Sequence, residues 1–159
     1  MKKIKLYSDG GTSPNPGIGG FGVILEYNGV KKEFCKGFKH STNNRMELLG
    51  VIFGLEQIKE PSKVDVFTDS SYVVNGIEKG WAKKWKANGW TKKLGKVMNI
   101  DLWARLLDLI QKHDVEFHWV RGHNGHLENE RCDELAWKAR RGELFDDVDK
   151  SEEVKNSVK

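Results

Sequence analysis

Residues 4–38, IKLYSDGGTSPNPGIGGFGVILEYNGVKKEFCKGF, decide the fold. Apolar and polar residues alternate at the start of this stretch, as in a strand with one buried face, and we expect this strand to end near Asp9. The glycine- and proline-rich residues that follow predict a loop. Residues 20–28 and 30–38 are two more strand-like runs, joined at an Asn-Gly pair that is typical of a tight hairpin turn. The chain therefore opens with three antiparallel strands.

Helices and strands alternate in the rest of the chain. Apolar residues recur with helical period over residues 44–59, and Pro61 ends that helix. The later elements are expected to be a strand over residues 64–69, a helix from Ser71, a helix over residues 102–110, a strand over residues 115–120 and a helix ending near Arg141. This order predicts an α/β fold in which helices cover a mixed sheet.

The chain has 159 residues, which is the size of one domain with a substantial core. No apolar run approaches the ~18 residues of a membrane span, and the first residues lack the apolar core of a signal peptide. We therefore expect a cytoplasmic protein without membrane contact. Its two cysteines, Cys35 and Cys132, lack the spacing of a metal site, and we interpret both as buried apolar residues.

The formal net charge of +4 comes from one segment. Residues 79–100 hold seven lysines and no acidic residue, and Trp81, Trp85 and Trp90 lie among these lysines. Lysines that neutralise phosphates, interleaved with aromatic rings, are typical of a nucleic-acid-binding surface. The alternative is a solvated basic helix whose tryptophans belong to the core. We call this segment the basic insertion.

Residues 142–159 have the opposite charge, with six acidic residues against three lysines. They show no sustained periodicity, and we expect this acidic tail to be partly disordered. The domain itself is expected to span residues 1–141, with the basic insertion inside it.

Four carboxylates occupy positions where a functional site could form. Asp9 and Asp69 stand at expected strand ends, where sites in open α/β sheets lie. Glu47 and Asp133 stand on expected helices. Each acid also has a structural explanation: Glu47 could close a capping box with Asn44, and Asp69 could cap the helix that follows it. Asp133 could be a solvated helix residue.

Four segments favour a functional explanation. In order and spacing they resemble the signature segments of ribonuclease H, type I, in its bacterial form: YSDGGTSPNPG, TNNRMELLG, FTDSSYVVNGI and WVRGHNGHLENERCDELA. The resemblance covers about residues 3–141. It implies a ribonuclease H-like fold with a five-stranded mixed sheet, three antiparallel strands followed by two parallel ones, flanked by helices. It also implies an endonuclease that hydrolyses the RNA strand of RNA–DNA hybrids and leaves 5′-phosphate and 3′-hydroxyl ends.

The resemblance assigns catalytic roles to five residues. The acids Asp9, Glu47, Asp69 and Asp133 would bind two Mg²⁺ ions, with Mn²⁺ able to substitute, and His123 would assist from a loop. Carboxylate oxygens suit Mg²⁺, and two such ions can orient the attacking water and stabilise the leaving oxygen. Repulsion among the four acids is expected to raise their pKa values when no metal is bound.

Discrimination between RNA and DNA must depend on the 2′-hydroxyl group. By resemblance, the RNA strand lies over the acids and the DNA strand over the basic insertion. The residues expected to contact the hybrid are Gly10, Gly11, Asn15, Thr42, Asn43, Asn44, Trp81, Lys83, Lys84, Trp85, Lys86 and Asn99. Asn43 and Asn44 could also cap the helix that begins there. Two positions depart from the family pattern: Ser71 replaces a common glutamine, and His40 replaces a common arginine.

Two other functions are open at this point. The chain could bind hybrids without cutting them, or it could be a DNA nuclease or strand-transfer enzyme of the same fold. The complete acid set favours catalysis, because binding alone gains nothing from four repelling carboxylates under a phosphate backbone. The His123 loop and the basic insertion favour hybrids over duplex DNA. We expect a monomer without an obligate protein partner.

Overall fold

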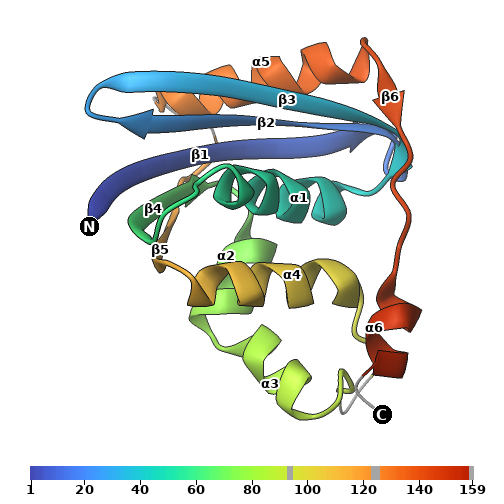
Figure 1. Ribbon diagram of the computed structural model, residues 1–159. Helices are drawn as coiled ribbons and strands as arrows, with labels where there is room; N and C mark the ends of the chain where they lie inside the picture. Colours follow the sequence, from blue (N-terminus) through green and yellow to red (C-terminus); the bar gives the residue numbers. More distant parts are fainter. Residues whose placement is uncertain (93–94, 123–125, 158–159) are drawn as a thin grey trace.

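The computed structural model describes residues 1–92, 95–122 and 126–157 and is built around a six-stranded sheet of order β5-β4-β1-β2-β3-β6 (Figure 1). The elements are β1 (Lys2–Ser13), β2 (Gly17–Tyr27), β3 (Val30–Ser41), α1 (Asn43–Glu56), β4 (Ser62–Thr68), α2 (Ser71–Glu78), α3 (Trp81–Ala87), α4 (Ile100–Gln111), β5 (Asp114–Trp119), α5 (Leu127–Arg140), β6 (Leu144–Phe145) and α6 (Ser151–Ser157). None of the helices in these described ranges is long and apolar enough to cross a membrane.

The pairing of the strands confirms the expected mixed sheet. β1, β2 and β3 are antiparallel neighbours, and β4 and β5 continue the sheet in parallel on the other side of β1. The hairpin turn falls at Asn28 and Gly29, whose φ angles of 51° and 77° are those of the expected tight turn. The sheet has one strand more than expected: β6 pairs in parallel with the edge of β3. Two residues are too few to show a strand period in the sequence.

The first strand is longer than expected. β1 does not end near Asp9 but continues to Ser13, so Gly10 and Gly11 lie in a strand and the predicted loop is wrong at these positions. Residues 10–13 pair with residues 18–21 of β2, because backbone pairing needs no side chain. The parallel ladder with β4, in contrast, ends at Tyr7. Asp9 therefore follows the end of the parallel ladder while remaining held by β2.

Helices cover both faces of the sheet. α1 and α4 lie on one side and α5 on the other (Figure 1). The larger apolar core lies between the sheet and α1, α2 and α4, and a smaller cluster of Tyr7, Ile24, Cys132 and Leu135 lies under α5. α5 approaches β2 closely, because a Cβ on Gly22 would stand 2.3 Å from the Cys132 carbonyl oxygen. Only glycine fits there.

One of the two cysteine predictions is confirmed. Cys132 is fully buried between α5 and the sheet, as expected. Cys35 is exposed, and its interpretation as a buried residue was wrong. Its strand, β3, forms the edge of the sheet at this residue, because β6 pairs only with Gly37 and Phe38.

The basic insertion combines both interpretations of its tryptophans. α3 packs against α2 and α4. Trp90 is buried at 2% exposure and Trp85 packs edge-on against Trp103 of α4, so these rings belong to the core. Trp81, in contrast, is 40% exposed. The three lysines of α3, Lys83, Lys84 and Lys86, are all exposed.

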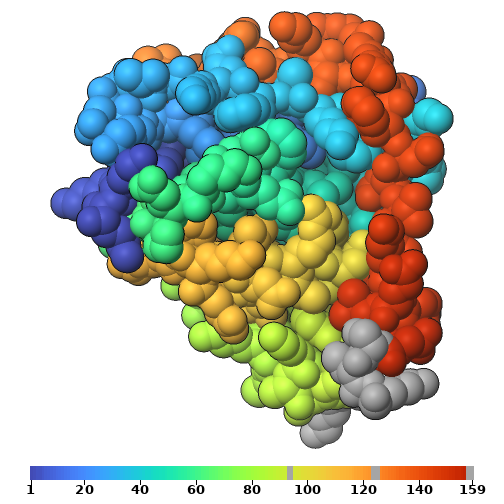
Figure 2. All heavy atoms as spheres, viewed as in Figure 1, coloured from blue at the N-terminus to red at the C-terminus, as the bar shows by residue number. Residues whose placement is uncertain are grey.

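The described residues of the acidic tail, 142–157, contact the rest of the domain. From β6 its described residues run along one side of the molecule to α6, which packs on α4 (Figure 2). Asp147 accepts hydrogen bonds from Ser41 at 2.6 Å and from the Arg45 Nε at 2.9 Å. Such polar contacts hold the described residues of the tail against distant elements. They leave no periodic pattern in the sequence.

Candidate active site

Four carboxylates meet where the parallel ladder of β1 and β4 ends. Oxygen atoms of Asp9, Glu47 and Asp69 lie within 4.8 Å of one another. Asp133 lies beside them, close enough for its charge to raise the pKa of Asp9. All four line an open pocket of about 450 Å³. The remaining residues that line this pocket are Gly10, Asn43, Asn44, Ser70, Ser71 and Tyr72.

The fold brings these acids together by two routes. Asp69 follows the last residue of β4, and Asp9 lies just beyond the parallel ladder between β1 and β4. Both acids therefore lie at the same end of these two neighbouring strands. Glu47 arrives on α1, which can approach β1 because residue 10 is glycine. A Cβ on Gly10 would lie 2.7 Å from the main-chain carbonyl of Met46.

The structural explanations for the acids are wrong. The N-cap of α1 is Thr42, whose hydroxyl accepts a hydrogen bond from the Arg45 amide at 3.2 Å, so Glu47 closes no capping box. The N-cap of α2 is Ser70, not Asp69. Asp133 is half-buried and faces Asp9 instead of standing free in solvent. None of these acids is therefore needed to start a helix.

The site is electrostatically costly without a cation. Burial raises the pKa of Asp9 to about 8, and the charges of Asp69 and Asp133 add to this shift. Burial, followed by the charges of Asp9 and Asp69, also raises the pKa of Glu47 well above its usual value, while a hydrogen bond from the Gly10 amide opposes the rise. At neutral pH the metal-free pocket therefore retains protons that a bound cation would displace.

The donor set fits a divalent metal ion. Glu47 Oε1 is buried and accepts no hydrogen bond from the described residues. A buried carboxylate oxygen without a donor is unfavourable, and a cation in the pocket would satisfy it. The pocket offers carboxylate oxygens, which are the donors that hard divalent cations prefer.

Asn129 is a site residue that the sequence analysis missed. Its side chain is 1% exposed, and Nδ2 donates to the Ser8 carbonyl at 3.2 Å and to the Phe67 carbonyl at 3.1 Å. It thus ties β1 to β4 just before Asp9 and Asp69, one helical turn ahead of Asp133. The Ser8 partner lies 121 residues away in the chain. No local pattern could have revealed this bond.

The polar residues expected to read the RNA strand lie together beside the acids. Asn43 Oδ1 accepts from the Thr12 amide at 2.8 Å, and Asn15 Oδ1 accepts from the Asn43 amide at 3.1 Å. Gly11 lies under the Asn43 side chain. These bonds use the side-chain oxygens of both asparagines, and they tie Asn15 to Asn43, which lines the pocket.

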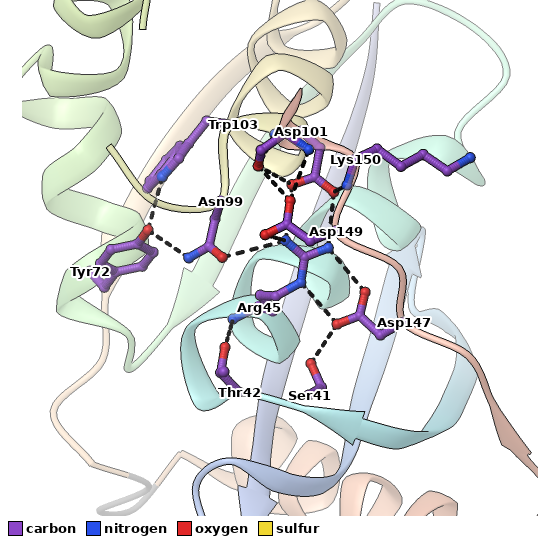
Figure 3. A network of polar contacts seen from close by, with 11 residues as sticks. Ser41, Thr42, Arg45, Tyr72, Asn99, Asp101, Trp103, Asp147, Asp149 and Lys150 are labelled. Atoms are coloured by element: carbon purple, nitrogen blue, oxygen red, sulfur yellow. Dashed lines mark hydrogen bonds and ion pairs between the residues drawn. The ribbon is translucent and has the colours of Figure 1, made fainter. Parts of the chain in front are cut away.

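The residues expected near the DNA strand divide into two groups. Asn99 is buried, and its side chain bonds Tyr72 at 3.0 Å and Arg45 at 3.4 Å. Thr42, the α1 N-cap, belongs to the same network because its hydroxyl accepts from the Arg45 amide (Figure 3). Trp81, Trp85 and the lysines of α3 follow the far end of α2, a helix about 12 Å long at 1.5 Å per residue. His123 lies outside the described residues.

Fold and site together define an α/β protein with a mixed sheet and a carboxylate pocket whose donor set is compatible with divalent cations. The sequence model of the RNase H family matches residues 1–141. The chain belongs to the ribonuclease H family. A curated relative, Ribonuclease H of Desulforamulus reducens, is 58% identical over 137 residues, which cover 86% of each chain.

Solved structures agree with this assignment. LC9-RNase H1, described as a type 1 RNase H with the type 2 active-site motif, has 32% sequence identity and a TM-score of 0.78, with 96% of this chain and 80% of that chain covered. LC11-RNase H1, solved in complex with an RNA/DNA hybrid, has 22% identity and a TM-score of 0.65 over 86% of this chain and 95% of that one. The second likeness concerns the fold alone.

Proposed function

We propose that the chain is an endonuclease that hydrolyses the RNA strand of RNA–DNA hybrids, with Mg²⁺ ions held by Asp9, Glu47, Asp69 and Asp133. The observation that carries this proposal is the convergence of the first three carboxylates within 4.8 Å in an open pocket, in a chain of the ribonuclease H family. Noncatalytic hybrid binding would not require this arrangement. The products would carry 5′-phosphate and 3′-hydroxyl ends.

Each group of residues has a distinct task in this proposal. When bound, the metal ions supply Lewis-acid activation of water and stabilise the leaving oxygen. Gly10, Gly11, Asn15, Asn43 and Asn44 face the RNA strand, where a 2′-hydroxyl can be recognised by amide groups. Thr42, Asn99 and the basic insertion hold the DNA strand. His123 moves a proton at the leaving group.

A cleavage assay tests the function directly. We expect purified protein with Mg²⁺ to cut the labelled RNA strand of a hybrid and to leave duplex DNA and single-stranded RNA intact. Binding without cleavage would favour the noncatalytic alternative, and digestion of duplex DNA would favour a DNA nuclease of the same fold. End-labelling of the products then distinguishes 3′-hydroxyl from 3′-phosphate ends.

The role of His123 predicts a partial loss of activity. His123→Ala should slow turnover by roughly 10²-fold without abolishing it, within the range for groups that transfer protons. The measurement is single-turnover cleavage between pH 6 and 9. His126→Ala serves as a control of a neighbouring histidine. Equal turnover of wild type and His123→Ala across this pH range would remove His123 from the mechanism.

The basic insertion predicts a salt-dependent change in binding. Replacing Lys83, Lys84 and Lys86 by glutamine should weaken hybrid binding and reduce the salt dependence of the affinity, by about one unit of slope for each phosphate that α3 no longer neutralises. A variant of three exposed lysines elsewhere, Lys3, Lys32 and Lys112, controls for net charge. An unchanged slope in the α3 variant would show that this helix does not contact the hybrid.

A further inference from the structure

A guanidinium group with no role so far lies beside the acid site, at the end of α5. Arg140 Cζ stands 3.6 Å from the centre of the Trp137 ring, so the cation stacks on an indole that is itself 46% exposed. The Arg140 stem packs over Gly20, where its Cγ lies 3.0 Å from the position of an added Cβ. Both the stem and the head of this side chain are therefore held in place.

The head of Arg140 points to the rim where RNA recognition is proposed. Its Nη1 lies 3.8 Å from the point that a Cβ on Gly11 would occupy, and Asn43 Oδ1 lies 3.5 Å from the same point. The two side chains thus flank one spot above the Gly11 backbone, two residues along β1 from Asp9. A ligand over this spot would meet the Arg140 cation on one side and the Asn43 side-chain oxygen, a hydrogen-bond acceptor, on the other.

Arg140 has unused hydrogen-bonding capacity. It forms no ion pair with any residue in the described ranges, and its buried Nε donates no hydrogen bond to one. Burial lowers the pKa of Arg140, while the charges of Asp133 and Asp9 oppose the shift, which places the guanidinium within electrostatic reach of the acid site. A planar guanidinium in a fixed orientation is well suited to phosphate oxygens.

We propose that Arg140, held by Trp137, binds a phosphate of the RNA strand on the Gly11–Asn43 side of the acid site. This inference rests on the proposed function, which supplies the hybrid and places its RNA strand over the acids. The contact adds a positive anchor on the face of the sheet opposite the α1 and α4 side. It would fix the register of the RNA strand relative to the carboxylates without taking part in bond cleavage.

Binding measurements in an uncleaving background test this contact. In an Asp9→Asn protein with Mg²⁺, Arg140→Gln keeps part of the stem over Gly20 but removes the charge. We expect about tenfold weaker hybrid binding, as for the loss of one charge-assisted hydrogen bond, and a salt slope smaller by about one. Lys138→Gln removes an exposed charge from the same helical turn and is expected to leave the slope unchanged. Melting curves verify that both variants are folded.

Hybrids with single neutral methylphosphonate linkages then locate the contact. At one position in the RNA strand, a neutral linkage should weaken binding by the protein that retains Arg140. The same hybrid should bind Arg140→Gln as well as the unmodified hybrid does. Sensitivity at a DNA linkage instead would overturn the strand assignment. Two results would show that Arg140 merely offsets the acidic charge. One is that Arg140→Gln leaves the hybrid affinity and its salt slope unchanged. The other is that tighter Mn²⁺ binding is the only effect of the substitution. If the Asp9→Asn protein and wild type both fail to bind hybrid, the proposed function fails as well.

Discussion

Asp9→Asn should abolish hybrid cleavage and yet raise the stability of the metal-free protein at pH 8. The loss of activity is expected to exceed the ~10²–10³-fold lost with a single transition-state hydrogen bond, because the variant loses a ligand shared by the cluster. The gain in stability has a separate cause. In wild type, Asp9 is buried beside Asp69 and Asp133, and its ionised form is disfavoured.

The pH dependence of this gain follows from the direction of the pKa shift. The pKa of Asp9 rises from 3.8 to about 8 on folding, so between these values the folded state binds more protons than the unfolded chain. The stability of wild type therefore falls as pH rises from about 4 to about 8, and the full penalty applies above that window. An amide at position 9 does not titrate, so the variant should lose less stability over the same range.

Thermal unfolding in a chelating buffer is the appropriate measurement. At pH 8 we expect the variant to melt higher than wild type by roughly 4–8 °C, the equivalent of about 2 kcal/mol for a chain of this length. Adding Mg²⁺ should raise the melting temperature of wild type more than that of the variant. A metal-free variant that melts below wild type at pH 8 would contradict the clustering of repelling acids.

Arg45→Met should cause the largest loss of stability of any single change considered. Arg45 is buried between α1, α4 and the acidic tail, with Asp101 bound through two bonds of 2.9 Å and Asp147 through bonds of 2.9 and 3.0 Å (Figure 3). Removing one partner of a buried ion pair leaves charges without compensation. The cost is typically about 3–5 kcal/mol.

A surface ion pair provides the matched control. Arg131 binds Glu33 at 2.8 Å, but both side chains are 42% exposed, so Arg131→Met should cost at most about 1 kcal/mol. Urea denaturation of the two variants should therefore differ by at least about 2 kcal/mol. Equal losses would show that the buried network contributes no more than a surface pair.

Acid pH should reproduce part of the Arg45→Met effect in wild type. Burial opposes ionisation of Asp101, but hydrogen bonds from Arg45 and from the Lys150 amide outweigh it and lower the pKa of Asp101. The stability that this group contributes is present above its unfolded-state pKa and is lost as pH falls through the lowered folded value. Arg45→Met should accordingly show a weaker loss of stability on acidification than wild type.

The acids could be predicted because the four segments that contain them resemble the signature segments of ribonuclease H, whereas local signals predicted only the strands and helices that carry them. Asp69 follows a strand whose residues are buried with a clear period of two. Glu47 stands in a helix that is buried over most of its length, so its apolar residues indicate a helix without marking a single buried face. The end of β1 was misplaced, because Gly10 and Gly11 indicate a loop when considered alone but gain strand pairing from β2. Local propensity fails where a partner strand supplies the hydrogen bonds.

The parts that sequence analysis missed depend on contacts between distant residues. Asn129 bonds a main-chain carbonyl 121 residues away, and Arg45 binds an aspartate 102 residues away. Polar side chains such as Asp147 hold the acidic tail against the domain. Such contacts do not require apolar residues at regular intervals, so the tail shows no periodic pattern. A single sequence contains no signal for such pairs, and only the folded chain reveals them.

Anomalous diffraction from crystals grown with Mn²⁺ is the most direct test of the metal pocket. We predict strong anomalous peaks within coordination distance of carboxylate oxygens from Asp9, Glu47 and Asp69, and no such peaks in Asp9→Asn crystals under the same conditions. Strong peaks elsewhere, with this pocket empty in a protein that still cleaves hybrids, would contradict the assignment of the four acids as the metal site.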